Sequence, residues 1–439
     1  MTTNDDPWRS ISGRTAQAIA MEIRSLIEQG TVPPGDRLPT VRSLAQTLEV
    51  SPTTITEAWN RLLSAGLIRT EGRRGTFVSP RVGKRSVETA LGSIVMDVAQ
   101  GAVDASLLPD LRPAIDAALR SPDLHAHDFS YITNELRAAV EPSWPYRPEA
   151  WTTTDGGMDA ASLALRALTR QGHVVALEQP ASQRTISLLR TARRRVVGVR
   201  WDDEGPSPDE LRHAIEAQNA SLFAWQPRTH YPTGRTVSER RLDALAEVLE
   251  THPHVVVLED DLAGDASVAP PRSLAAHLPD SVVRIRSFDA AYGLDLRTAV
   301  VSGSRDNIRA LNTARGALAV WNSRILQNAL AWLLQDADTQ TLVDRAAKTY
   351  QKRRSVLVDA IRGHGVTMDA GTGTVVWVPV KDEVEAVDVL DDAGIASGLG
   401  SVCWLDASDQ RHIRVPVGAH ELGPVESARL AAAVAHAAR

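Results

Sequence analysis

The chain has 439 residues, of which 43% are hydrophobic and 23% charged, and its formal net charge is −6 at pH 7. This composition is ordinary for a globular protein, and no apolar run approaches the ~20 residues that a membrane-spanning helix needs. The N-terminus, MTTNDDPWRS, has neither the basic flank nor the apolar stretch of a secretory signal, and the single cysteine, Cys403, excludes an internal disulfide. We therefore expect a cytoplasmic protein of two folded units.

Charged residues are unevenly distributed along the chain. Basic residues outnumber acidic ones in the N-terminal part although the chain as a whole is acidic, and such an asymmetry suggests separate roles for the two ends. Lysine is scarce, and its positions are Lys84, Lys348, Lys352 and Lys381.

Three short helices are predicted in the N-terminal part. Residues 13–30 carry apolar side chains at helical spacing, and a second short pattern covers residues 41–49 after the break PPGDRLPT. Ser51 followed by Pro52 is typical of a helix start, because the serine hydroxyl accepts from a free backbone N–H and proline lacks the donor that would be unpaired there. We expect this third helix to extend to about Ala65.

The first turn of the third helix is rich in hydroxyl groups, from Ser51, Thr53 and Thr54. Hydroxyl and free N–H groups at a helix N-terminus can contact phosphates and base edges, as the recognition helix of a helix-turn-helix does. The following LIRTEGRRGTFVSP predicts two short strands joined by a turn that carries Arg73, whose guanidinium can reach phosphates or the minor groove. The alternative is a generic helical cap with a solvated arginine face.

The stretch PPGDRLPTVRSLAQTLEVSPTTITEAWNRLLSAGLIRTEGRRGTFV resembles the winged helix of the GntR regulators. The resemblance implies a DNA-binding domain at residues 8–79 that contacts double-stranded operator DNA. The residues that it implies as contacts are Arg42, Ser51, Thr53, Thr54, Arg73 and Gly75. One position departs from the family pattern, since Pro52 stands where the family commonly has arginine, which implies a different operator or weaker binding.

A linker and a larger domain are predicted after the winged helix. Residues 80–96 lack a clear pattern and are interpreted as a linker, either lying along DNA phosphates or merely solvated. From 97 to 439, β-like runs such as VVALEQP and HVVVLEDD alternate with helical segments, which predicts a parallel sheet with helices on both faces. We therefore expect an α+β winged helix followed by an α/β domain with a mostly parallel sheet.

The landmarks of this larger domain resemble, in order, those of the fold-type I aminotransferases, and with the winged helix they resemble the MocR subfamily of regulators. The motifs are TDGGMDAASLAL, HYPTG, LEDDL, SFDAAYGLDLR and HIRVPVG. The resemblance implies Gly156, Gly157, Ser287 and Arg297 for the cofactor phosphate, Asp260 for the pyridinium nitrogen, and Arg414 for a substrate carboxylate. Asp260 could instead cap a helix, and the two arginines could be inherited ion-pair partners.

Several positions depart from the aminotransferase pattern. They are positions at which the resemblance implies contacts with the cofactor. Ala290 stands where the resemblance places the lysine of the Schiff base, and an imine needs a primary amine. The other replaced positions are Asp289, Leu262, Met158, Asp159 and Ser182. We expect no covalently held pyridoxal phosphate, while noncovalent binding of it or of a related vitamer stays open.

The preferred hypothesis is a homodimeric, DNA-binding transcriptional regulator whose aminotransferase-like domain dimerises and senses a small molecule, with Arg414 binding a carboxylate effector. No catalytic residue and no metal-ligand set are predicted. Two alternatives stay open: a pyridoxal phosphate-dependent, aminotransferase-type enzyme with a DNA-binding head, and a ligand-free architectural regulator.

Overall fold

The chain divides into two compact units, Met1–Asp97 and Val98–Arg439. The computed structural model describes residues 7–11, 13–28, 31–33, 35–64, 67–70, 75–78, 103–125, 130–316, 322–392, 395, 397–406, 410–418 and 424–438. The predicted linker, residues 80–96, lies outside this described part. In the described residues, no helix is long and apolar enough to cross a membrane.

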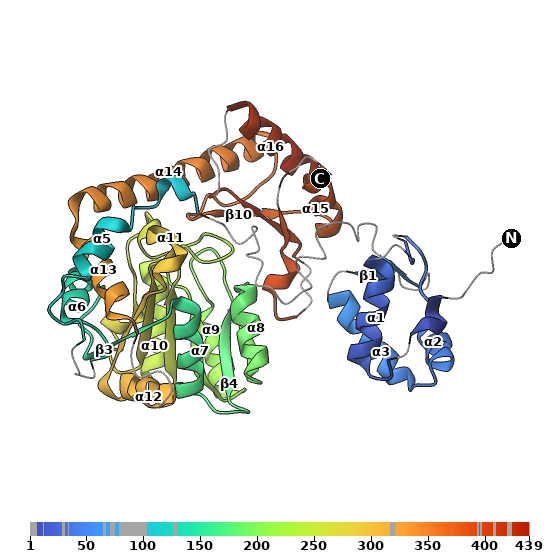
Figure 1. The fold of residues 1–439 in the computed structure, drawn as a ribbon, viewed down its shortest axis with the longest axis horizontal. Coiled ribbons are helices and arrows are strands. Elements are labelled where there is room, and N and C mark those ends of the chain that lie inside the picture. The colour runs from blue at the N-terminus through green and yellow to red at the C-terminus, as the bar shows by residue number, and fades with distance from the viewer. Residues whose placement is uncertain are drawn as a thin grey trace. The chain divides into compact units, whose positions relative to one another are not determined.

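The first unit is a small helical domain with a two-stranded wing (Figure 1). Its elements are the short 3₁₀-helix η1 (Pro7–Ser10), the helices α1 (Ala16–Glu28), α2 (Val41–Thr47) and α3 (Pro52–Ser64), and the strands β1 (Ile68–Thr70) and β2 (Thr76–Val78). Its core is built from the apolar positions of the three helices, among them Ile19, Ile23, Leu44, Ile55 and Leu62, each at most 2% exposed. The three predicted helices and the wing strands are thus confirmed.

The wing contains a third extended segment that the sequence pattern did not predict. β1 and β2 pair antiparallel, with Arg69 opposite Phe77, and Arg37 forms a β-bridge to Phe77 on the other side of β2. Leu38 N–H donates to Thr76 O at 2.8 Å. The segment around Arg37 therefore anchors the wing to the chain that enters α2.

The second unit is built on a seven-stranded sheet with the order β3-β9-β8-β7-β6-β4-β5. Its strands are β3 (Ala150–Thr154), β4 (Val174–Gln179), β5 (Arg195–Arg200), β6 (Ala220–Trp225), β7 (Val256–Asp261), β8 (Val282–Ser287) and β9 (Ala299–Gly303). The five strands β4 to β8 are parallel to one another. Strand β9 is antiparallel to both of its neighbours, β3 and β8. Only residues 288–298 join β8 to β9, which is too short for a parallel crossover of a dozen or more residues.

Helices cover both faces of this sheet, as the sequence predicts. Along β4, Val174 and Ala176 pack into one apolar cluster with α9 and α10, while Val175 and Leu177 pack into the opposite cluster with α7, α8 and α12. Strands buried on both faces are typical of parallel sheets. The helices are α7 (Gly157–Leu168), α8 (Gln183–Thr191), α9 (Pro208–Glu216), α10 (Glu239–Glu250) and α12 (Arg305–Arg315).

A smaller three-stranded sheet, with the order β10-β12-β11, forms the C-terminal part of this unit and was not predicted. Its strands are β10 (Val375–Pro379), β11 (Gly398–Leu399) and β12 (His412–Pro416), and its helices are α14 (Ala337–Gly363), α15 (Glu383–Asp392) and α16 (Pro424–Ala437). Figure 1 shows α14 running from the large sheet's side of the unit to α16 and β10. The remaining helices are α5 (Arg112–Ala118), α6 (Asn134–Val140), α11 (Asp289–Tyr292) and α13 (Arg324–Gln335).

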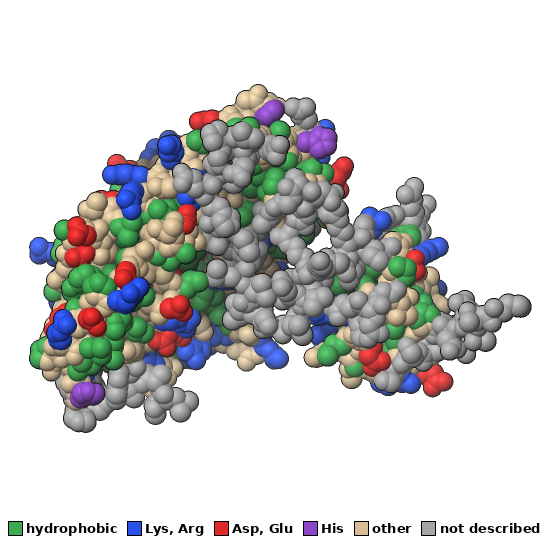
Figure 2. Space-filling model, turned by 45° about the horizontal axis from the view of Figure 1, so that its top comes forward, with side chains coloured by type: hydrophobic (Ala, Val, Ile, Leu, Met, Phe, Trp, Pro, Cys, Tyr) green, Lys and Arg blue, Asp and Glu red, His purple; other side chains and the backbone are tan. Residues whose placement is uncertain are grey.

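The surface of the second unit carries charges of both signs. On the face drawn in Figure 2, both acidic and basic side chains are exposed.

Candidate functional sites

Four of the predicted DNA contacts, Arg42, Ser51, Thr53 and Thr54, lie at the N-terminal ends of α2 and α3, two helices that pack against each other. Ser51 Oγ accepts from Thr54 N–H at 3.1 Å and lies 2.8 Å from Thr54 Oγ1, so the serine caps α3 as the sequence predicts. Thr53, at the second position of α3, is exposed. The cap fixes the start of α3 and leaves Thr53 directed away from the core.

Arg42 is the second residue of α2 and is exposed to solvent. Thr40 caps this helix, since its hydroxyl accepts from Ser43 N–H at 3.1 Å. In the described part of the chain the Arg42 guanidinium forms no ion pair or hydrogen bond. Its charge is therefore available to a phosphate or a base edge.

The wing adds residues that the sequence reasoning missed. Arg37 and Arg69 lie opposite Phe77 from its two sides, and directly paired residues project to one face of a sheet. Both arginines are exposed and Phe77 is half-buried. Arg37 is the arginine of the PPGDRLPT motif, so its presence could be read from the sequence. Its pairing with Phe77, which brings it to the wing, could not.

Gly75 has a structural role at the start of β2. Its φ is +115°, and a Cβ at this position would lie 2.8 Å from Arg37 Nε. A larger residue would therefore strain the backbone and displace Arg37 from the wing. Arg73, the other predicted wing contact, lies outside the described residues.

The predicted cofactor residues of the second unit meet at the carboxyl edge of the large sheet. We call Gly156, Gly157, Asp260, Ser287 and Asp289 the carboxyl-edge site. Gly156 precedes α7 with φ +94°, and a Cβ on Gly157 would lie 3.3 Å from Ser287 Cβ and 3.4 Å from its Oγ. The glycine pair thus lets the N-terminus of α7 approach the end of β8, whereas the predicted binding of an anion there stays a prediction.

Asp289 extends into this cradle. A Cβ on Gly156 would lie 3.4 Å from Asp289 Oδ2. Burial raises the pKa of Asp289, and the neighbouring Ser287 hydroxyl and the charges of Arg297 and Arg184 only partly offset that effect. Asp289 Oδ1 and Ser287 Oγ are both buried without a hydrogen-bond partner among the described residues. Ala290 follows in α11 and packs against the apolar cluster that contains Phe288 and Tyr292.

Asp260 lies near the end of β7 and does not cap a helix. Burial, reinforced by the charge of Asp261, raises the pKa of Asp260 to about 7. Its Oδ1 has no hydrogen-bond partner in the described structure. Asp261 behaves oppositely: burial would raise its pKa, but Arg284 and Arg228 lower it to about 2. An acid with an unpaired buried oxygen is a candidate acceptor for a ligand donor.

The two predicted arginines have different surroundings. Arg297 is exposed and adopts a left-handed conformation with φ +45°. Arg414, on β12, is only 3% exposed; its Nε donates to Leu399 O at 3.0 Å and its Nη1 to the Tyr231 hydroxyl at 2.7 Å. Arg414 is therefore already engaged, and its phenol partner was not predicted from the sequence.

Two of the replaced positions have local structural roles. Asp159 Oδ2 accepts from Asp155 N–H at 3.2 Å and so closes the turn before α7. Ser182 caps α8 by accepting from Arg184 N–H at 3.3 Å. Leu262 and Met158, in contrast, are large apolar side chains that are 39% and 38% exposed.

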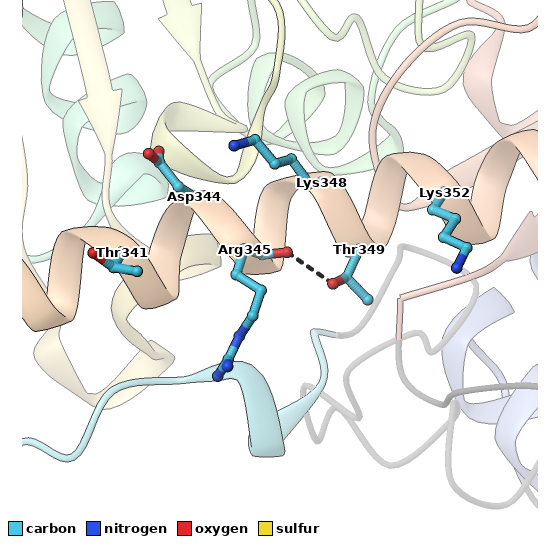
Figure 3. Close-up of a pocket in the computed structure, with 6 residues that line it drawn as sticks. All are labelled: Thr341, Asp344, Arg345, Lys348, Thr349 and Lys352. Carbon is cyan, nitrogen blue, oxygen red and sulfur yellow. Dashed lines mark hydrogen bonds between the residues drawn. The ribbon is translucent and has the colours of Figure 1, made fainter.

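An open pocket of about 440 Å³ lies along α14 and shares no residue with the carboxyl-edge site. Thr341, Asp344, Arg345, Lys348, Thr349 and Lys352 line it. Figure 3 shows that all six side chains come from this one helix. In the described residues, no group of three His, Cys, Asp or Glu side chains could hold a metal ion.

Family comparisons agree with the two folds. Residues 15–78 match the bacterial regulatory proteins of the gntR family, and residues 93–426 match aminotransferase class I and II. Among solved structures, the domain is similar to the kynurenine aminotransferase of Pyrococcus horikoshii, with a TM-score of 0.68, 17% identity, and coverage of 77% of this chain and 89% of that one. An archaeal alanine:glyoxylate aminotransferase gives a TM-score of 0.68, 19% identity and the same coverage. These likenesses establish the fold.

Relatives that match both domains are named as regulators. The vitamin B6 salvage pathway transcriptional repressor PtsJ of Salmonella typhimurium is 31% identical over 381 residues, which are 86% of this chain and 88% of PtsJ. The pyridoxine biosynthesis transcriptional regulator PdxR of Corynebacterium glutamicum is 24% identical over 356 residues, 77% of each chain. The chain therefore belongs to the GntR family of bacterial regulatory proteins and, through its larger domain, to aminotransferase class I and II, and as a whole it is a MocR-type, DNA-binding transcriptional regulator.

Proposed function

We propose that the aminotransferase-like domain of this regulator is a noncovalent sensor and dimerisation domain and has no transaminase activity. The observation that carries the proposal is the sequence of α11, where Asp289 and Ala290 follow directly after Ser287 and Phe288 at the end of β8. Ala290 supplies no primary amine at that point of the fold, and an imine with an aldehyde cofactor needs one.

The residues fit pyridoxal phosphate only in part. The glycine turn, the Ser287 hydroxyl and the unpaired Asp260 oxygen suit a phosphopyridine, as the resemblance implies. Ala290 offers no anchor, and the Asp289 carboxylate faces the Gly156 turn, where a Cβ would lie 3.4 Å from its Oδ2. We conclude that the group does not fit as a covalent cofactor, and no catalytic step is assigned to it.

Dimerisation is the second element of the proposal. Helix-turn-helix proteins read two half-sites with two copies of the reading helix, which requires two chains related by a two-fold axis. A ligand then acts by favouring one placement of the two winged helices, and it can do so only through a difference in affinity between the two states. A regulator that binds operator DNA acts in the compartment that contains the chromosome. This agrees with the cytoplasmic location expected from the sequence.

The names of two relatives and one residue of the second unit suggest the effector class. The relatives PtsJ and PdxR are named for vitamin B6 salvage and pyridoxine biosynthesis, which makes B6 vitamers the first compounds to test. A carboxylate at Arg414 is the second candidate, and it would have to compete with the Tyr231 hydroxyl for the guanidinium.

Operator binding in the presence of candidate effectors tests the proposal. The full-length protein is titrated onto fluorescent DNA from the region upstream of its own gene, with sedimentation equilibrium to give the stoichiometry. We expect a dimer on the DNA and an operator affinity that changes with one of the vitamers or carboxylates. An affinity that no compound changes would favour the architectural alternative, and turnover of an amino acid would favour the enzyme.

A further inference from the structure

We infer that Asp289 is an internal anion that takes the place of a ligand phosphate, so that the carboxyl-edge site selects ligands without a phosphate group. The inference rests on the proposed sensing function and names the class of ligand. The ligand class is a small nitrogen-containing molecule with a donor for Asp260 and a neutral polar group, such as a hydroxyl, near Ser287.

The first argument is the position of the Asp289 carboxylate. It faces the turn at Gly156, where a Cβ would meet Oδ2 at 3.4 Å and Oδ1 at 3.9 Å. This turn begins α7, and the unpaired N–H groups and positive end of a helix attract an anion. A carboxylate supplied by the chain therefore occupies surroundings that attract an anionic ligand group.

The second argument is the distribution of charge around Asp289. The neighbouring Ser287 hydroxyl and then the charges of Arg297 and Arg184 lower the pKa of this carboxyl, against the larger opposing effect of its burial. Neither guanidinium forms an ion pair with it in the described structure, so their charges act on Asp289 from a distance. A phosphate dianion at the same place would face the Asp289 carboxylate as well as these two arginines, and two like charges in contact repel each other strongly.

The third argument is that the site still has polar atoms directed to a ligand. Ser287 is 1% exposed and lies at the Gly157 turn; its hydroxyl is close enough to Asp289 to lower the pKa of that carboxyl, but its Oγ forms no hydrogen bond of full geometry among the described residues. Asp260 Oδ1 is likewise buried and unpaired in the described part. Buried polar atoms without a partner are rare in folded proteins and call for a water or a ligand. A neutral hydroxyl can pair with Ser287, and a protonated nitrogen with Asp260.

Pyridoxamine and pyridoxamine 5′-phosphate are suitable probes because they differ only in the phosphate. Neither has an aldehyde, so neither forms an imine with any of the four lysines. Calorimetric titration of both into the full-length wild type, Asp289→Ser and Asp289→Asn is the experiment. Asp295→Ser is the matched control, because it removes an exposed acid from the adjacent turn η8 (Leu294–Leu296) and leaves the cradle intact.

We expect Asp289→Ser to gain affinity for pyridoxamine 5′-phosphate by about tenfold or more, since a carboxylate is removed from contact with the phosphate. Asp289→Asn is expected to gain less, because the side chain still fills the cradle, and Asp295→Ser is expected to match the wild type. Wild-type binding of the phosphorylated probe at least as tight as that of pyridoxamine would overturn the inference, and so would an Asp289→Ser variant with no gain. The titration contains no DNA, so its failure is distinct from a failure of operator binding or of regulation.

Discussion

The Arg414 guanidinium donates from Nη1 to the Tyr231 hydroxyl at 2.7 Å and thereby connects the two sheets of the second unit. Arg414 lies on β12 of the small sheet, whereas Tyr231 lies in the loop after β6 of the large sheet. Arg414 is almost fully buried. A buried charge that loses a hydrogen-bond acceptor is costly, so this contact stabilises the placement of one sheet on the other.

Replacing Tyr231 with phenylalanine should lower the free energy of unfolding by about 1–3 kcal/mol, because the buried guanidinium loses an acceptor. Urea unfolding of the full-length protein measures the change. Tyr131→Phe is the control, since in the described residues the Tyr131 hydroxyl forms no hydrogen bond while its ring lies 5.6 Å from the Arg315 guanidinium carbon. Equal stability of the two variants would contradict the role given to the contact.

Arg42→Ala and Arg37→Ala should each weaken operator binding. The expected loss is about 1–3 kcal/mol for an arginine that contacts a base edge, whereas a phosphate contact would mainly reduce the salt dependence. Anisotropy titrations at several salt concentrations separate these cases. Arg61→Ala, whose guanidinium pairs with Glu57 at 2.9 Å on α3, provides the control. If Arg42→Ala and Arg37→Ala both bind the operator like Arg61→Ala, the assigned DNA-binding surface is wrong.

Ser51→Ala should destabilise the winged helix by about 1 kcal/mol, because Thr54 N–H loses its side-chain acceptor at the start of α3. Thr53→Ala, at an exposed neighbouring position, should leave stability nearly unchanged and act only on DNA binding. Urea unfolding followed by far-ultraviolet circular dichroism measures the first effect. A Ser51→Ala variant as stable as the wild type would show that the cap is dispensable.

The stability of the wild type relative to Asp260→Asn should depend on pH. The pKa of Asp260 is raised to about 7 in the folded protein from an ordinary value of 3.8, because of burial and the charge of Asp261. Between these values the folded state binds more protons than the unfolded state, so wild-type stability should fall as pH rises from about 4 to about 7, by up to about 4 kcal/mol.

Thermal unfolding of the wild type and of Asp260→Asn across this pH range measures the difference, with Asp295→Asn as the control at an exposed acid. A constant difference between wild type and Asp260→Asn would mean that Asp260 is ionised throughout.

Local patterns predicted the winged helix and most of the large sheet. The Ser51–Pro52 start of α3 and the apolar runs of β4 to β8 are local signals, and the structure confirms them. The direction of β9 and the small sheet were not predicted, since both depend on how distant segments pack. β3 was missed for the same reason, because among the described residues it pairs only with β9, far along the chain.

The residues of the carboxyl-edge site could be named from the sequence, but their contacts with one another could not. The resemblance named Gly156, Gly157, Asp260 and Ser287, and the sequence identified Asp289 as a departure. Only the fold brings the Asp289 carboxylate to the Gly156 turn and leaves the Ser287 and Asp260 oxygens unpaired among the described residues. In the same way, the pairing of Arg414 with Tyr231 spans 183 positions of sequence and has no local signal.

Titration of the full-length protein with pyridoxal phosphate, followed by visible absorbance and by borohydride reduction with peptide mapping, tests the central claim most directly. A Lys348→Ala, Lys352→Ala double variant controls for imines on the exposed lysines of α14. We expect no stoichiometric imine band in the wild type and a band in Ala290→Lys. A stoichiometric band in the wild type that persists in the lysine double variant would contradict the assignment of this domain as a noncovalent sensor.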